Sequence, residues 1–214
     1  MTEDGGSKVI AERLRAVVEL RDKYSGQTAW IVGKGPSLAH LRADHFTDSG
    51  PVMTMNEAIL IVQKLGIPNT IYSMQKDGCH MDPDIRCTVE CQMHWPMVYP
   101  DAEVTAILQD PGFSQECLPR HEKKLWVDPV RELKFHEATE MSVLMCIRLA
   151  KIMGCVKIHL VSCDSLAGDY RTIDVHTLQS AVNGFSGHYA YVVPQVREAL
   201  KGFPHAIILP RGGQ

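Results

Sequence analysis

The segment that most constrains the fold runs from Ala29 to Leu38 and reads AWIVGKGPSL. Its apolar run is typical of a short buried strand, and the glycine turn after it predicts a change of direction into a helix. Gly33 and Gly35 permit backbone angles and close approaches that a Cβ would block. Ser37 is expected to cap the helix, so that unpaired N–H groups gather beside the Lys34 cation. The turn therefore predicts a seat for a phosphate or nucleotide, the alternative being a tight turn without a ligand.

Short apolar runs alternate with helix-like stripes along the rest of the chain. We expect strands at 30–32, 51–55, 70–74, 104–108, 124–127, 156–161 and 205–209, and helices at 9–24, 57–65, 140–153 and 187–201. This alternation predicts an α/β fold with a mostly parallel, Rossmann-like sheet and helices on both faces. The 214 residues suit one domain at 29–214, preceded by a helix within 1–28.

Polar residues follow several of these strands at their carboxyl ends. Asn56 follows the second strand, Gln75 and Asp77 follow the third, and Asp164 follows the strand at 156–161. Ligands of open α/β sheets bind outside the carboxyl ends, at the point where the strand order reverses. We therefore expect these residues and the glycine turn to surround a nucleotide. For Asn56 a helix cap is the alternative, and for Asp77 a turn.

The segment 79–100 is rich in Cys, His, Met, Asp and Pro and predicts an irregular loop or lid over the site. It contains Cys79, Cys87, Cys91 and His94, which are ligand types suited to tetrahedral zinc. Their spacing is not that of a standard zinc finger, and methionines lie between them. A loop packed by Cys and Met is therefore the favoured interpretation, and we expect no metal.

Composition excludes some function classes. A net charge of −3 gives no electrostatic reason for non-specific nucleic-acid binding. The sequence has no uncharged apolar run long enough for a membrane span. Its first residues lack the basic-then-apolar order of a secretory signal, and its seven scattered cysteines fit reduced thiols. We expect a cytoplasmic protein, and a homo-oligomer stays open.

Four separated motifs resemble one family in their order along the chain. They are Gly33–Leu38, Met55–Asn56, Met141–Cys146 running on to Ile158–Asp164, and Ser186–His188. This order resembles the bacterial family 42 sialyltransferases. It also resembles the group related to archaeal 6-hydroxymethylpterin pyrophosphokinases, which shares the G-x-G-P-S-L opening. The resemblance spans about 29–210, with a poor match over 79–139, and implies a sialyltransferase-like fold.

The resemblance to sialyltransferases implies transfer of a sugar from a CMP- or UDP-linked donor to a hydroxyl acceptor such as a carbohydrate, without a metal. It implies that His188 is the general base and that the Tyr170 hydroxyl supports the leaving phosphate. The implied nucleotide contacts are the glycine turn, Ser37, Asn56, Ser142 and Asp164. The family usually has Asn at the position of Lys34, and this difference leaves the identity of the nucleotide-sugar donor undetermined.

The chemistry of the residues fits this reaction but does not single it out. Histidine suits a general base because its pKa lies near neutrality, and His176 is the second candidate. One alternative is an ATP- and Mg²⁺-dependent pyrophosphokinase acting on a pterin-like alcohol, with Asp77, Asp82, Asp84 and Asp164 near the metal. The others are a non-catalytic nucleotide-binding module and a phage-encoded DNA-base glycosyltransferase, for which nucleic acid is the acceptor only.

Overall fold

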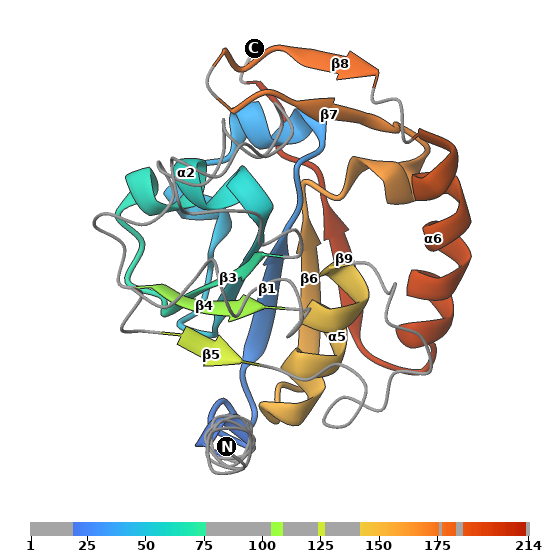
Figure 1. The fold of residues 1–214 in the computed structure, drawn as a ribbon. Coiled ribbons are helices and arrows are strands. Elements are labelled where there is room, and N and C mark those ends of the chain that lie inside the picture. The colour runs from blue at the N-terminus through green and yellow to red at the C-terminus, as the bar shows by residue number, and fades with distance from the viewer. Residues whose placement is uncertain are drawn as a thin grey trace, which may run out of the picture.

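The structure is a computed structural model of the chain and describes residues 19–75, 104–108, 124–126, 142–175, 177–182 and 186–212. Seven strands form one sheet in the order β5-β4-β3-β2-β1-β6-β9, and all neighbours pair in parallel (Figure 1). The strands are β1 (Thr28–Val32), β2 (Val52–Met55), β3 (Ile71–Gln75), β4 (Val104–Leu108), β5 (Lys124–Trp126), β6 (Lys157–Val161) and β9 (His205–Ile208). The predicted parallel α/β sheet is confirmed.

The connections between these strands carry the helices. The α-helices whose bounds the structure describes are α2 (Ile59–Val62), α5 (Ser142–Ile152) and α6 (Ser186–Ala199). The 3₁₀ turns are η1 (Pro36–His40), η2 (Ala43–His45), η3 (Asn56–Ala58), η4 (Gln63–Leu65) and η5 (Asp164–Ala167). Because η3, α2 and η4 follow one another directly, they correspond to the single helix expected at 57–65. The expected helix at 9–24 and the loop at 79–100 fall largely or wholly outside the described residues.

The sheet separates two hydrophobic cores, and β1 contributes to both. Ala29 and Ile31 pack with α5 and α6, whereas Trp30 and Val32 pack with Leu38 of η1 and with α2. Successive strand side chains point to opposite faces, so an uninterrupted apolar run is what a strand covered on both faces requires. Helices cover both faces of the sheet, as the sequence predicts (Figure 1).

The layer formed by α5 and α6 ends at the amino edge of the sheet. The main chain of Asp22 donates to Ile152 O at 2.9 Å, which holds the end of α5 beside the start of β1. Lys151 Nζ donates to Ala199 O at 2.6 Å and lies 4.9 Å from the centroid of the Phe203 ring, so it satisfies a carbonyl at the end of α6. Both helices therefore start at the opposite edge, where the strands have their carboxyl ends.

The second core contains a polar contact between Trp30 and its neighbours. Trp30 Nε1 donates to Asp48 Oδ1 at 2.9 Å, and the indole ring packs edge-on against His159 with ring centroids 4.4 Å apart. Burial lowers the pKa of His159, so its imidazole is neutral at physiological pH. His159 therefore belongs to the packing of β6 against β1.

The described part of the chain adds one element that the sequence pattern does not reveal. β7 (Arg171–Ile173) and β8 (Ser180–Val182) form an antiparallel hairpin outside the main sheet. Three residues are too few to show the alternation by which a strand is recognised. In the same part of the chain, no helix has the length and apolar content needed to cross a bilayer.

Candidate functional site

The strand order reverses between β1 and β6, and this switch point is where open α/β sheets bind ligands. The turn after β1 and the turn after β6 are joined there by main-chain hydrogen bonds. Gly33 N donates to Val161 O at 2.8 Å, and Gly35 N donates to Ser162 O at 2.9 Å. The structure thus brings the glycine turn and Asp164 together, as expected from their positions after two strands.

Close packing between these turns explains the two glycines. A Cβ on Gly33 would lie 2.6 Å from Ser162 O, and one on Gly35 would lie 2.0 Å from Asp164 Oδ2. Neither glycine has a positive φ, so the expected need for special backbone angles is wrong. Glycine is required at both positions because a Cβ would clash with the neighbouring turn. The described turn therefore fits tightly against a second segment of the same chain.

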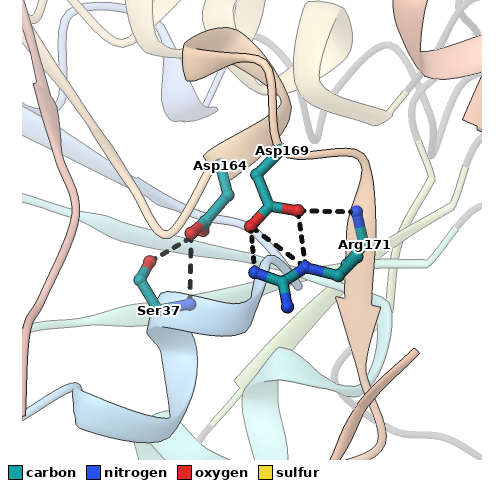
Figure 2. A network of polar contacts seen from close by, with 4 residues as sticks. All are labelled: Ser37, Asp164, Asp169 and Arg171. Atoms are coloured by element: carbon teal, nitrogen blue, oxygen red, sulfur yellow. Dashed lines mark hydrogen bonds and ion pairs between the residues drawn. The ribbon is translucent and has the colours of Figure 1, made fainter. Parts of the chain in front are cut away.

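Ser37 and Asp164 form the central polar contact of the site (Figure 2). Ser37 Oγ donates to Asp164 Oδ2 at 2.7 Å, and Ser37 N donates to Oδ1 at 3.2 Å. Both residues are buried. The prediction that Ser37 caps a helix is wrong, because Gly35 occupies the cap position, Pro36 begins η1, and the hydroxyl is committed to Asp164. The helix is also a five-residue 3₁₀ turn, too short to support the predicted phosphate seat at its start.

Lys34 is paired within the chain. Its ammonium donates to the carboxylate of Glu57, with the Lys34 side chain 25% exposed and that of Glu57 9% exposed. Glu57 directly follows Asn56 at the end of β2, and its position after a strand was the only sequence signal for it. Lys34 therefore forms an ion pair with Glu57 between the ends of β1 and β2. The sequence predicts only a cation at this position, without a partner.

Two residues at this edge adopt backbone conformations that are uncommon for their type. Asn56 has φ +49° and Ser162 has φ +52°. Asn tolerates this region, whereas Ser does so less readily. Ser162 is fully buried, and its Oγ has no hydrogen-bond partner among the residues that the structure describes. Backbone strain together with an unsatisfied buried hydroxyl is a local cost of the kind that gathers at functional sites.

Replacing Ser162 by glycine is expected to raise the free energy of unfolding by about 1 kcal/mol, because it removes both the strain and the unsatisfied hydroxyl. Urea denaturation measures the change. Ser165→Gly in η5 is the matched control, since Ser165 lacks a positive φ and gains nothing from glycine. If Ser162→Gly lowers the free energy of unfolding as much as the control does, then the backbone conformation and the hydroxyl of Ser162 do not destabilise the protein.

The remaining predicted site residues divide into three groups. Gln75 ends β3 at the carboxyl edge, and Ser142 and His188 lie in the first turns of α5 and α6, which start at that edge. Tyr170 lies between η5 and β7 and is half-buried. The others lie outside the described residues, and they are Asp77, Asp82, Asp84, His176, Cys79, Cys87, Cys91 and His94.

Two possible chemistries can be tested on the described residues. Burial raises the pKa of the Cys163 thiol to about 12, so this cysteine beside the glycine turn is protonated and is no nucleophile at neutral pH. No cluster of three His, Cys, Asp or Glu that could hold a metal occurs among the residues that the structure describes.

The sheet order and the joined turns define a doubly wound α/β protein with a candidate site at its β1/β6 switch point. Among solved structures, the chain is similar to a mammalian sialyltransferase at 12% identity, with a TM-score of 0.46 and 94% of this chain and 79% of that chain covered. It is also similar to a mammalian sialyltransferase in complex with Gal-beta-1-3GalNAc-ortho-nitrophenol, at 12% identity, a TM-score of 0.43 and the same coverage. No protein-family model matches the chain, and no curated protein matches it significantly.

Proposed function

We propose that this protein is a glycosyltransferase that moves a sugar from a nucleotide-linked donor to a hydroxyl group of a carbohydrate or another acceptor. One observation carries the proposal. The motifs that resemble family 42 sialyltransferases are far apart in the sequence, yet their described parts gather at the carboxyl edge of the sheet. The glycine turn, Asn56 and Asp164 follow three adjacent strands, and Ser142 and His188 lie in the first turns of the two helices that start at that edge.

In this proposal the nucleotide lies across the ends of β1, β2 and β6. Asn56 and Ser142 contact the nucleotide, and Gln75 lies at the end of the neighbouring strand β3. Asp164 holds Ser37 and the glycine turn in place and contacts the ribose or base at its rim. The paired Lys34 and Glu57 border the site between β1 and β2.

The reaction needs a proton acceptor and a stabilised leaving group. His188 accepts the proton of the acceptor hydroxyl as its oxygen bonds to the anomeric carbon. The bond from that carbon to the donor phosphate breaks, and the nucleotide leaves with the electron pair. Tyr170, beside the end of η5, donates a hydrogen bond to the departing phosphate. The proposed reaction uses neither a metal nor another cofactor.

A thermal-shift panel with CMP, UDP, CMP-sugars and UDP-sugars tests the proposal. A ligand present at a hundred times its Kd stabilises the folded state by about 2.7 kcal/mol, which raises Tm by several degrees. A nucleotide that raises Tm is then followed by an assay for its release from the matching sugar donor. An unchanged Tm across the panel would contradict the proposal.

Two other results of these assays identify the alternatives. Release of AMP from ATP with a hydroxymethylpterin, strictly dependent on Mg²⁺, would identify a pyrophosphokinase. Nucleotide binding without release of nucleotide from any sugar donor, tested with carbohydrate acceptors and with DNA, would identify a non-catalytic binding module.

A further inference from the structure

Arg171, the first residue of β7, lies beside the Ser37–Asp164 contact and is held by Asp169 (Figure 2). Arg171 Nε donates to Asp169 Oδ1 at 2.9 Å, and Arg171 Nη2 donates to Oδ2 at 2.6 Å. The main chain of Arg171 donates to the same Oδ1 at 3.1 Å. Asp169 thus fixes both the main chain and the plane of the guanidinium group.

Main-chain contacts hold this pair against the candidate site. Asp169 N donates to Asp164 O at 3.1 Å, two residues before Arg171. Ile173 N donates to Lys34 O at 2.9 Å, two residues after it, so that β7 lies over the glycine turn. The arginine is therefore tied on one side to the turn after β6 and on the other to the turn after β1.

The guanidinium group keeps hydrogen-bonding capacity after this pairing. Arginine has five N–H donors, and Asp169 takes the Nε donor and one Nη2 donor. The other three have no partner in the described part of the chain, and the side chain is 50% exposed. Because the guanidinium group is a half-exposed cation that carries donors and no acceptor, its three remaining N–H groups suit an anionic oxygen such as that of a phosphate.

We propose that Arg171 is the anion-binding side chain of the candidate site and contacts the phosphate of the nucleotide, with Asp169 as its positioning residue. The assignment to a nucleotide phosphate rests on the proposed function. In this proposal Arg171 is the cation beside the phosphate, a role that the sequence suggested for Lys34. The ammonium group of Lys34 is instead paired with Glu57. Planar bidentate contact with phosphate is a property of arginine that lysine lacks.

The charges around Arg171 set the strength expected of this contact. Lys34 and Arg171 are positive, while Glu57, Asp164 and Asp169 are negative. Asp164 is buried and bonded to Ser37, and Asp169 is bonded to Arg171, so the carboxylates are engaged within the chain. We expect weak binding of a simple anion that weakens further as salt is added, because the arginine is exposed.

Titration calorimetry with inorganic pyrophosphate tests the proposal without any need for turnover. We expect Arg171→Gln to weaken binding about tenfold to a hundredfold, as loss of charge-assisted hydrogen bonds does. Asp169→Asn is expected to weaken it less, because the arginine remains but is no longer fixed. Arg42→Gln is the matched control, since Arg42 forms the same exposed i,i+2 contact with Asp44, and it is expected to leave binding unchanged.

Three results separate this proposal from the glycosyltransferase proposal. Pyrophosphate binding that Arg171→Gln abolishes supports the assignment even if no sugar donor is turned over. Equal affinities for pyrophosphate in Arg171→Gln and Arg42→Gln overturn it, even if the wild-type protein transfers sugar. Absence of pyrophosphate binding to the wild-type protein at low salt also overturns it.

Discussion

Replacing His188 by alanine is expected to leave the fold intact and to lower the rate of sugar transfer by about a hundredfold to ten-thousandfold, the usual contribution of a general base. The reason is that no group at this position would then accept the proton of the acceptor hydroxyl. His188 lies in the first turn of α6, which starts at the carboxyl edge of the sheet. The rate of nucleotide release from the donor measures the loss, and Tm measures the integrity of the fold.

The matched control for this prediction is His205→Ala. His205 is exposed on the edge strand β9, and its Nδ1 lies 2.8 Å from Phe203 O. Its removal is expected to leave the transfer rate unchanged. A His188→Ala variant that transfers sugar at the wild-type rate would remove His188 from the mechanism, and His176→Ala would then be the variant to measure.

Replacing Gly35 by alanine is expected to lower the free energy of unfolding by about 3 kcal/mol, because the new methyl group would lie 2.0 Å from the buried Asp164 Oδ2. Either the two turns separate or the hydrogen bonds from Ser37 to Asp164 are lost. Urea denaturation measures the change. Gly212→Ala is the matched control, since its Cβ would meet only the His40 ring at 3.3 Å.

A double-mutant cycle tests the cause of this loss. With Asp164→Ala as the background, the carboxylate that would lie 2.0 Å from the new methyl group is absent, and only the Cβ at 2.7 Å remains. Gly35→Ala is therefore expected to cost less than in the wild type, but still to cost some stability. An equal cost in both backgrounds would show that the carboxylate is not the source of the strain. A change no larger than that of Gly212→Ala would show that the two turns are not packed as described.

The sequence predicts the layers of this fold well because each layer has its own pattern. The strand at 28–32 is covered on both faces and therefore reads as an apolar run, and α5 shows the apolar stripe of a buried helix. The position of the switch point depends on the order of the strands in the sheet, and the alternation of strands and helices along the sequence does not give that order. The alternation does predict a parallel sheet. That is why the positions of Asn56 and Asp164 at one edge could be expected before their contacts were known.

The contacts within the site could not be predicted in the same way. Ser37 and Asp164 are 127 residues apart, and no local pattern indicates that a serine bonds to a distant carboxylate instead of capping its own helix. Lys34 meets Glu57 because β1 and β2 are neighbours, a fact of register that the sequence alone does not give. Arg171 was missed because β7 is only three residues long.

The pairing of β1 with β6 has a consequence for how the chain folds. The hydrogen bond between Ser37 and Asp164 closes a loop of 127 residues, and contacts this distant along the chain slow folding because ordering entropy is lost before they form. During synthesis, the edge of β1 that pairs with β6 therefore stays unpaired until β6 has left the ribosome. A nascent chain that ends before residue 157 exposes the middle of its own sheet, which makes it prone to aggregation.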